Sequence, residues 1–406
     1  MRAVLADLST PRYLWTAAAG RLKGDAGWGP GGVMRLADVP EPALPKADGW
    51  LRIKPELSGI CGSDVGLAHA QNSFVMSAFY AEPKAVPGHE VVGVVTEGSL
   101  EGQRVLLDPI LSCVHRGFEP CRTCREARPY ACERFDEPGI TGCHAPGQGF
   151  SDAVGGGWGE SLVAHESQCF PIGDIPSKRA VLAEPAAIGL HAALQWKRTG
   201  DRVVVIGPGA IGLLVTAALR MLHPDLDIAM ISRGEFGAAN ALRAGATRTL
   251  PGGAAAVEQL AASDGGRVVR PRMTKIPILE QGVDAVFDCV GSPDTIDLSL
   301  HLLRPGAMLV LVGAAGKQTA DWSLVWSREL TVQGTINAGP EPTLGGKRTM
   351  AQVAEWLADP AYPVDGLVTH QFELDEWQKA LSTASAGSRA QAVKVTLRPN
   401  PDVPLV

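Results

Sequence analysis

The stretch RVVVIGPGAIG (202–212) joins a run of branched apolar residues to Gly207, Gly209 and Gly212 in G-x-G-x-x-G spacing. The apolar run predicts a buried strand, and AIGLLVTAALRML (210–222) has the length and apolar periodicity of a helix. Between a strand and a helix, such glycines permit a tight turn and let the backbone approach a pyrophosphate, whose charge the helix N-terminus favours. The stretch therefore predicts a dinucleotide-binding domain, with an ordinary glycine-rich turn as the alternative.

A second match to the same glycine spacing shows why the flanking residues decide the interpretation. Gly27, Gly29 and Gly32 lie in GWGPGG, with no strand pattern before them and no helix pattern after them. Because the spacing alone is a weak signal, we expect this second match to be a loop.

Strand and helix patterns continue to alternate after residue 222, which indicates βαβ units and a parallel sheet. A basic stretch in this part, RVVRPRMTK (267–275), is interpreted as a solvated surface loop. The expected strands are DIAMIS (227–232), DAVFDCVG (284–291) and AMLVLVG (307–313), and the expected helices are EFGAANALRAG (235–245) and TIDLSLHLLRPG (295–306).

The flanking parts of the chain have a different composition. Residues 1 to 185 are rich in Gly and Pro and contain short apolar runs such as VVGVV (91–95), which predicts a β-rich domain. After ELTVQGT (329–335) the pattern loosens into a helix near 347–358 and a last strand, AVKVTL (392–397). The chain of 406 residues is long enough for two domains, so the predicted fold class is α/β with an additional β-rich domain.

Composition and charge exclude several classes of protein. A formal net charge of −6 argues against the basic face that a nucleic-acid partner requires. The start MRAVLADLSTPRYLW lacks the features of a secretory signal, and the longest apolar run, AMLVLVGAA, is too short to cross a bilayer. We expect a cytoplasmic protein that binds a small molecule, with no membrane and no nucleic-acid partner.

Four of the eight cysteines lie within CVHRGFEPCRTCREARPYAC. In a cytoplasmic protein, clustered cysteines are more often metal ligands than disulfides. Four thiolates in one loop predict a closed, structural zinc site, with disulfides or a redox C-x-x-C pair as alternatives. Isolated Cys143, Cys169 and Cys289 are interpreted as small apolar residues. The four clustered cysteines are Cys113, Cys121, Cys124 and Cys132.

A second set of metal-ligand residue types is spread over three segments. Cys61 lies in GICGSDVG (59–66), His89 and Glu90 in PGHEVVGVV, and Glu184 in AEPAAIGLHA. A thiolate, an imidazole and a carboxylate can hold zinc and leave one position open, as a catalytic site requires. Taken singly, His89 could be a turn histidine and Glu184 a carboxylate at a helix start.

Together these motifs resemble the zinc-dependent medium-chain alcohol dehydrogenases, especially the polyol, sugar and threonine dehydrogenase branch. The resemblance also includes GGGWGESLVAH and LRPGAMLVLVG, and it runs in the expected order over nearly the whole chain. It implies a GroES-like β-rich catalytic domain formed by residues 1–185 and 336–406. It also implies a Rossmann domain with a doubly wound parallel sheet at 186–335, with the active site in the cleft between the domains.

The resemblance assigns roles to individual residues. Cys61 and His89 are the implied catalytic zinc ligands, and Glu90 and Glu184 are the carboxylates that complete the zinc shell directly or through water. Ser63 matches the hydroxyl that hydrogen-bonds the substrate oxygen and relays its proton.

Further implied residues orient a ligand or contact the cofactor. Asp64 matches the acceptor that orients the ligating histidine. The loops after two strands, FDCVG and LVGAAG, would flank the nicotinamide. The residues concerned in these loops are Cys289, Val290, Val312 and Gly313.

The end of the second nucleotide-domain strand predicts the cofactor. An NAD-binding Rossmann domain places an acidic residue about 20 positions after the glycines, where it binds the ribose 2′-hydroxyl. Here Ser232 stands at that position and Arg233 follows it. A serine hydroxyl and a guanidinium can bind a 2′-phosphate, so we expect NADP(H) to be preferred over NAD(H). Alternatively, Ser232 only starts a turn and Arg233 points to solvent.

Three features depart from the family pattern. Gly66 stands where many members carry a histidine that passes the proton to solvent, and His69 is a candidate replacement. The common cysteine spacing would place the first cysteine of the lobe at Phe118, so Cys113 replaces it only if the intervening residues loop out. Residues 10–32 form an additional glycine-rich segment.

The leading hypothesis is a homodimeric or homotetrameric, zinc-dependent enzyme that transfers a hydride between NADP(H) and an alcohol or polyol, with one catalytic and one structural zinc. Two alternatives use the same fold. One is a zinc-free quinone or enoyl reductase, and the other is a nucleotide-binding protein without turnover.

Overall fold

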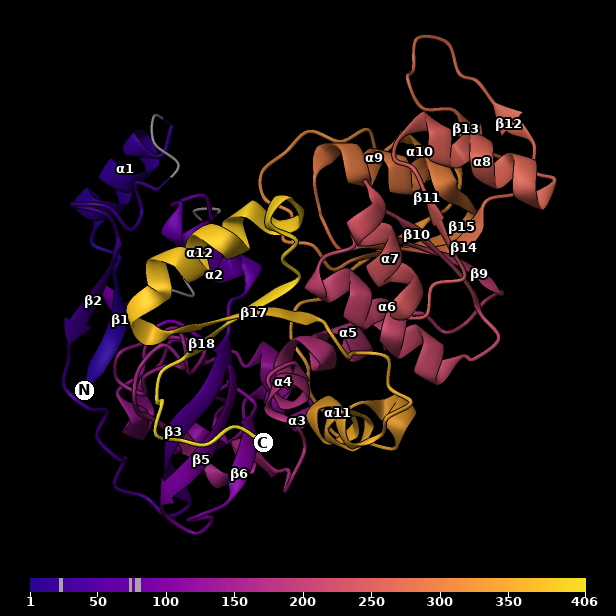
Figure 1. The fold of residues 1–406 in the computed structure, drawn as a ribbon. Helices are drawn as coiled ribbons and strands as arrows, with labels where there is room; N and C mark the ends of the chain where they lie inside the picture. Colours follow the sequence, from indigo (N-terminus) through magenta and orange to yellow (C-terminus); the bar gives the residue numbers. More distant parts are fainter. Residues whose placement is uncertain (22–24, 73–74, 77–81) are drawn as a thin grey trace. The chain divides into compact units, whose positions relative to one another are not determined.

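The computed structural model describes residues 1–21, 25–72, 75–76 and 82–406, and the chain divides into two units (Figure 1). Pro185, 336–338 and 359–367 fall in the second unit, although the sequence analysis assigned them to the catalytic domain. The last of these segments lies against the second unit, where a Cβ on Gly366 would be 3.3 Å from Nη1 of Arg243. The first unit consists of Met1–Glu184, Gly339–Ala358 and Val368–Val406, and the second of Pro185–Ala338 and Asp359–Leu367.

The second unit contains the predicted parallel sheet, with strand order β11-β10-β9-β14-β15-β16. All neighbouring strands in it run parallel. Because the order reverses between β9 and β14, a crevice for a ligand is expected at the carboxyl ends of these two strands. The strands are β9 (Arg202–Ile206), β10 (Asp227–Ile231), β11 (Arg248–Leu250), β14 (Val283–Asp288), β15 (Leu303–Leu311) and β16 (Thr331–Gly334).

Helices alternate with these strands, which confirms the doubly wound fold (Figure 1). Two sequence expectations were wrong. The helix predicted over 295–306 ends at Leu302, where β15 begins, and the predicted loop 267–275 contains the short strand β12 (Val268–Val269), which pairs with β13 (Ile278–Leu279). The helices are α5 (Ala183–Gln195), α6 (Ala210–Leu222), α7 (Glu235–Arg243), α8 (Ala254–Asp264), α9 (Pro293–Leu302) and α10 (Ser323–Ser327).

The first unit contains the β-rich fold, a larger sheet of order β17-β18-β3-β5-β6-β8 with β7 paired to β3, and a smaller sheet β2-β1-β4. Because β18 pairs antiparallel with β3, the last strand of the chain lies beside a strand from its N-terminal part. The larger sheet contains β3 (Trp50–Gly59), β5 (Glu90–Glu97), β6 (Arg104–Leu107), β7 (Leu162–His165), β8 (Cys169–Pro171), β17 (Val368–Glu373) and β18 (Lys394–Arg398). The smaller sheet contains β1 (Arg2–Asp7), β2 (Met34–Asp38) and β4 (Lys84–Ala85).

Short helices connect and cover these strands. The additional segment 10–32 forms one helix followed by turns, so the second glycine match lies in turns as predicted; residues 22–24 lie outside the described residues. The α-helices are α1 (Thr10–Ala19), α2 (Gly62–Ala68), α3 (Arg122–Arg125), α4 (Ser177–Ala180), α11 (Thr349–Ala358) and α12 (Trp377–Ala386). The 3₁₀ helices are η2 (Val114–Arg116), η3 (Pro129–Ala131), η4 (Gly139–Thr141), η5 (Glu166–Gln168), η6 (Pro342–Leu344), η7 (Leu374–Glu376) and η8 (Gly387–Ala390).

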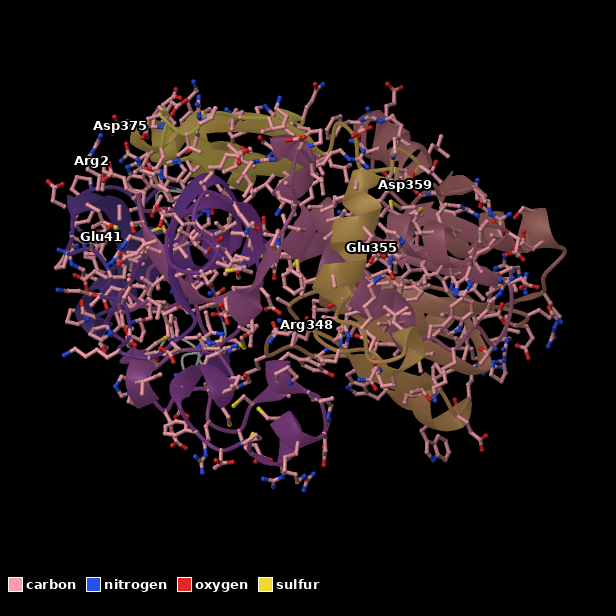
Figure 2. All side chains as sticks on the ribbon, turned by 90° about the horizontal axis from the view of Figure 1, so that it is seen from below. Arg2, Glu41, Arg348, Glu355, Asp359 and Asp375 are labelled. Carbon is pink, nitrogen blue, oxygen red and sulfur yellow. The ribbon has the colours of Figure 1, made fainter. Side chains whose placement is uncertain are left out.

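Ion pairs fasten the C-terminal part of the first unit to its N-terminal part. Arg2 of β1 pairs with Asp375 of η7, and both are labelled side by side in Figure 2. Arg348 pairs with buried Asp108, which follows β6. Together with the β18–β3 ladder, these contacts show that the last residues are an integral part of the first unit's sheet.

The glycine turn after β9 provides a matched test of packing. A Cβ on Gly212 would lie 1.9 Å from the carbonyl oxygen of Gly207, whereas a Cβ on Gly209 would meet no atom within 4 Å. Gly212→Ala is therefore expected to lower the free energy of unfolding by about 1–3 kcal/mol, the usual cost of overpacking. Gly209→Ala should leave the thermal unfolding midpoint of the cofactor-free protein unchanged. Equal midpoints for the two variants, measured by calorimetry, would contradict this packing.

Candidate functional site

Three metal-ligand residue types meet at the ends of two paired strands of the first unit. The ligand atoms of Cys61, His89 and Glu90 all lie within 4.8 Å of one another. Cys61 follows β3 and caps α2, while Glu90 opens β5 and lies opposite Gly59 in the β3–β5 ladder. A Cβ on Gly59 would be 1.8 Å from Oε2 of Glu90, so glycine is required to admit this carboxylate.

His89 is held in a buried position by its neighbours. Gly88 before it has φ of +92°, and the His89 ring stacks on Phe150 with 5.2 Å between centroids. Burial lowers the pKa of His89, but the charges of Asp64 and Cys61 outweigh it and raise the pKa well above its usual value. Nδ1 of His89 is buried without a hydrogen-bond partner among the described residues. A buried imidazole with an unpartnered nitrogen, grouped with a thiol and a carboxylate, fits a metal ion such as zinc.

Asp64 lies in the first turn of α2, close to this group. Its Oδ2 accepts a hydrogen bond from the backbone N–H of Cys61 at 2.9 Å. Burial raises the pKa of Asp64, and the positive charge of His89 opposes that shift. The Asp64 carboxylate therefore both binds the backbone of Cys61 and raises the pKa of His89.

Sequence reasoning missed one residue of this site, Lys394. It begins β18, and its Nζ donates to both carboxylate oxygens of Glu90, at 2.6 and 2.5 Å, and to the carbonyl of Ile60 at 3.3 Å. The side chains of Lys394 and Glu90 are only 3% and 1% exposed. Burial lowers the pKa of Lys394, but Glu90 and Cys61 raise it more. The available signal was a single lysine inside the apolar run AVKVTL.

Glu184, the fourth predicted member, does not belong to the group of mutually close ligand atoms. It lies in the first turn of α5. Burial raises its pKa to about 7; the charge of His89 opposes this shift and that of Glu90 adds to it. The structure therefore brings together three of the four predicted residues. Glu184 is outside this group, but its pKa responds to the charges of His89 and Glu90.

The four clustered cysteines form a second group, again with all ligand atoms within 4.8 Å of one another. Sγ of Cys113 lies 3.5 Å from Sγ of Cys132, and all eight cysteines, each among the described residues, are free. The residues after Cys113 form η2 and then reverse at Gly117, whose φ is +75°. The residues between Cys113 and Cys121 therefore loop out, as the irregular spacing requires. Phe118 packs against the cysteines. Burial raises the pKa of Cys121, but hydrogen bonds from Thr123 and Cys124 lower it to about 6.

Arg116, which sequence reasoning also missed, fixes the loop beside the cysteines. Its guanidinium is buried and donates to four backbone carbonyls at 2.5–2.6 Å. One lone arginine in VHRGFEP gave no signal of this role, because its partners are backbone atoms 19 to 29 residues later. The acceptors belong to Phe135, Glu137, Cys143 and Ala145.

The predicted nucleotide-binding residues of the second unit follow the carboxyl ends of four strands. Gly207 has φ of +102° directly after β9, and Gly209 caps α6. Ser232 follows β10; its Oγ is buried without a partner among the described residues, while Arg233 is exposed. The Ser232 N–H donates to the carbonyl of Leu250 at 3.0 Å.

Asp288 organises the loops after β14 and β15. Its Oδ1 accepts the N–H of Val290, and its carbonyl accepts the N–H groups of Val312 and Gly313. Cys289 donates its N–H to Ile206 of β9 at 3.0 Å. Because these strands are parallel neighbours, the loops lie at one edge of the sheet, where nucleotides bind in doubly wound folds.

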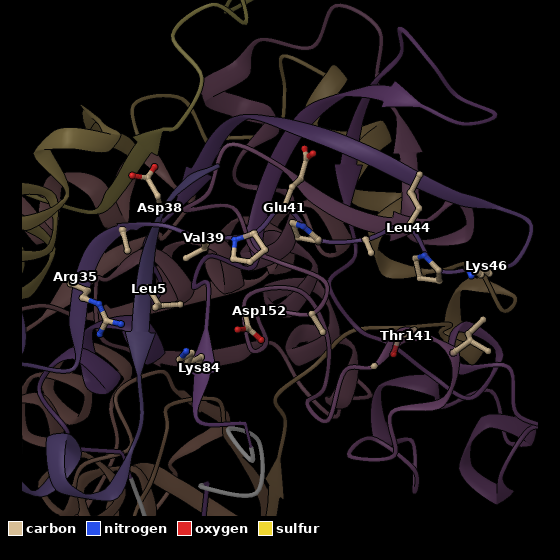
Figure 3. Close-up of a pocket in the computed structure, with 18 residues that line it drawn as sticks. Leu5, Arg35, Asp38, Val39, Glu41, Leu44, Lys46, Lys84, Thr141 and Asp152 are labelled. Atoms are coloured by element: carbon tan, nitrogen blue, oxygen red, sulfur yellow. The ribbon is translucent and has the colours of Figure 1, made fainter.

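A cavity of the first unit is separate from these residues. It has a volume of about 640 Å³ and lies beside β2 and the proline-rich segment after it (Figure 3). Arg35, Lys84 and Asp152 are among its lining residues, and it contains none of the predicted site residues. Its position gives it no part in the metal-ligand group.

Two family models match the chain. The alcohol dehydrogenase GroES-like domain matches residues 47–174, and the zinc-binding dehydrogenase model matches residues 210–359.

Curated relatives cover most of the chain. It is 29% identical to erythritol/L-threitol dehydrogenase of Mycolicibacterium smegmatis over 381 residues, which cover 90% of this chain and 94% of the relative. It is 26% identical to L-threonine 3-dehydrogenase of Xanthomonas oryzae pv. oryzae over 349 residues, which cover 84% of this chain and 90% of the relative.

Solved structures share the fold. A Sinorhizobium meliloti protein assigned as a zinc-binding dehydrogenase and bound to NADP has a TM-score of 0.66 and 25% identity, covering 90% of this chain and 95% of its own. Galactitol-1-phosphate dehydrogenase of Escherichia coli has a TM-score of 0.70 at 21% identity, covering 98% of this chain and all of its own.

Removing the Lys394 charge tests the buried ion pair. Lys394→Met leaves the Glu90 carboxylate buried without a counter-charge, so the free energy of unfolding of the metal-free protein should fall by about 3–5 kcal/mol. The double variant Lys394→Met with Glu90→Gln should recover most of that loss, because no uncompensated charge remains. Lys379→Met is the control, since its side chain is exposed and should change stability by less than about 0.5 kcal/mol in urea unfolding. A loss no larger than that of the control would refute the pairing.

Proposed function

This chain belongs to the zinc-dependent medium-chain alcohol dehydrogenase family, and from that premise we propose that it transfers a hydride between NADP(H) and an alcohol or polyol. The products of oxidation are the corresponding aldehyde or ketone. The observation that carries the proposal is the group of Cys61 with buried His89 and Glu90, in which one imidazole nitrogen has no partner among the described residues. The relatives, named for dehydrogenation of alcohols, support the same reaction class.

Cys61 and His89 would hold the catalytic zinc, with Glu90 or Glu184 completing its ligands. Zinc supplies a positive charge that lowers the pKa of an alcohol hydroxyl. Lys394 holds both oxygens of Glu90, which favours Glu184 as the carboxylate that is free to reach the metal. Cys113, Cys121, Cys124 and Cys132 would hold a second, structural zinc, for which their mutual proximity is the support.

Ser63 would take the proton of the alcohol, and Asp64, whose Oδ2 accepts the N–H of Cys61, would act on His89 through its charge. His69 is a poor candidate for passing that proton onward, because its Nε2 already contacts Oγ of Ser385 at 2.9 Å and its ring packs against Trp28. Gly66 has no side chain to do so. The proposed route therefore leads from Ser63 directly to solvent.

The two alternative functions receive less support. A zinc-free reductase would need neither the group at Cys61 nor the cysteine lobe, and the described residues form both. A nucleotide-binding protein without turnover would bind the cofactor but oxidise no alcohol, whether or not a chelator is present.

Metal content and activity test the proposal together. The wild type should contain two zinc ions per chain and lose alcohol oxidation after chelation. Cys61→Ser should abolish activity, because it removes the thiolate ligand, and should reduce the zinc content to one while leaving cofactor binding intact. Cys169→Ser is the control, since Cys169 lies in neither metal-ligand group. Full activity in Cys61→Ser, with unchanged zinc, would disprove the assignment.

The NADP(H) preference is supported by the residues after β10. Ser232 offers a buried hydroxyl without a partner among the described residues, and exposed Arg233 has no ion pair among them. Both can bind a 2′-phosphate, whereas the carboxylate nearest in sequence, Glu235, already lies in the first turn of α7.

The preference can be measured as the ratio of kcat/KM for NADPH and NADH. Arg233→Ala should lower that ratio about 10- to 100-fold, since a charge-assisted hydrogen bond contributes about 1.5–3 kcal/mol. Ser232→Asp combined with Arg233→Ala should reverse the preference. Arg272→Ala, which removes another exposed guanidinium of the second unit, should leave the ratio unchanged. A wild type that prefers NADH would rule the proposal out.

A homodimer or homotetramer is part of the proposal. The outer strand β16 is exposed at all four residues, and exposed apolar side chains lie near it in sequence, including Trp326 at 84% exposure and Ile336. An unpaired strand edge with apolar neighbours favours association with another copy.

No helix among the described residues is long and apolar enough to cross a membrane. A cytoplasmic location, supported by the free cysteines, and a small-molecule partner complete the proposal.

A further inference from the structure

Helix α2 begins at the metal-ligand group, because Cys61 is its N-cap residue. Ser63 and Gly66 lie one turn apart on this helix, about 4.5 Å along its axis, and both are partly exposed. They therefore share a face of α2 that starts beside the candidate metal centre.

The carboxamide of Asn72 occupies the space above Gly66. A Cβ on Gly66 would lie only 2.3 Å from Oδ1 of Asn72. Nδ2 of Asn72 donates to the carbonyl oxygen of Ser63 at 3.4 Å. The amide group thus lies along the same face as Ser63, in place of a side chain at position 66.

The backbone around Asn72 is fixed from two sides. The N–H of Gln71 donates to the carbonyl of Gly66 at 2.9 Å, and the hydroxyl of Tyr13 donates to the carbonyl of Asn72 at 3.3 Å. Tyr13 lies on α1, within the additional segment 10–32.

That segment is itself packed against the far end of α2. A Cβ on Gly27 would lie 1.6 Å from the carbonyl oxygen of Ala68, so glycine is required for this close approach. Trp28 packs edge-on against His69, and its carbonyl accepts a hydrogen bond from Gln378 of α12. The additional segment therefore forms a support that holds Tyr13, and through it Asn72, in place.

Two polar atoms on this face remain unused by the protein. Oδ1 of Asn72 and Oγ of Ser63 make no hydrogen bond to any residue that the structure describes, and both side chains are only partly exposed. An amide oxygen is an acceptor and cannot donate. Its complement is a hydroxyl or amine hydrogen on a bound molecule.

We propose that Asn72 is a specificity residue whose Oδ1 accepts a hydrogen bond from a second hydroxyl of the substrate, so that polyols are favoured over alcohols with one hydroxyl. This inference rests on the proposed function. The reacting hydroxyl lies at the metal centre by Ser63, and the second lies further along α2, above Gly66. The proposal also gives a role to the described residues of the additional segment, 10–21 and 25–32, which position Asn72.

The test compares four-carbon alcohols that differ in hydroxyl number: 2-butanol, the 2,3-butanediols and the butane-1,2,3,4-tetrols. The zinc-loaded full-length protein should have a higher kcat/KM for the best diol or tetrol than for 2-butanol. Asn72→Ala should reduce that preference about tenfold, as expected for loss of one hydrogen bond, with less than a twofold change for 2-butanol. Asn72→Asp keeps an acceptor oxygen and should retain the preference.

Gly66→Ala provides an independent check of the geometry. Its Cβ would displace the Asn72 carboxamide, so it should lose the same preference as Asn72→Ala, and the double variant should be no worse than either alone. Equal thermal midpoints would show that the variants fold. If the wild type oxidises alcohols but Asn72→Ala lowers kcat/KM equally for 2-butanol and the polyols, or if the two substitutions add, the inference is overturned. A wild type without zinc-dependent alcohol oxidation would overturn the proposed function as well.

Discussion

The buried ion pair between Lys394 and Glu90 is the interaction on which the rest of the candidate metal centre depends. Removing two charges from water costs several kcal/mol for each ion, and only close, complementary contacts offset that cost. Here both carboxylate oxygens lie 2.5–2.6 Å from the ammonium group, and Gly59 leaves the room that the carboxylate needs. The pair joins residues 304 positions apart, so the centre is complete only when β18 has paired with β3. The tail of the chain is thereby a component of the site.

A similar constraint holds the cysteine lobe. The four cysteines lie in a segment of short helices and turns, and Arg116 ties this segment to the one that follows by donating to four of its backbone carbonyls. The αL turn at Gly117 then places Cys113, and not residue 118, with the other three cysteines. The four cysteines come together despite their irregular spacing. Arg116 directly precedes the turn at Gly117, and its buried guanidinium binds the surrounding backbone.

Features that depend on residues close together in sequence could be predicted, whereas features that depend on contacts between distant residues could not. The strand–glycine–helix unit at β9 and α6, the clustered cysteines and the segments that carry Cys61 and His89 are local patterns, and the structure forms each of them. Lys394, Arg116 and the assignment of residues 359–367 depend on partners distant in sequence, and no window of residues identifies those partners. Glu184 illustrates the limit: its sequence neighbours suggested a ligand, but its carboxylate does not belong to the group of mutually close ligand atoms.

The same contrast explains the additional segment 10–32. Read alone, its glycines mimic a nucleotide fingerprint, yet their conformational freedom serves packing, since the turn at Gly27 approaches the backbone of Ala68 more closely than any side chain would allow. A chain that lacks a side chain at position 66 has an open volume beside Ser63, and open volume at a polar site admits water. Filling it with the Asn72 carboxamide, supported by Tyr13, excludes that water and leaves an acceptor in its place. The Asn72 carboxamide, whose backbone is held by a residue of the additional segment, thus occupies the space that glycine leaves at position 66.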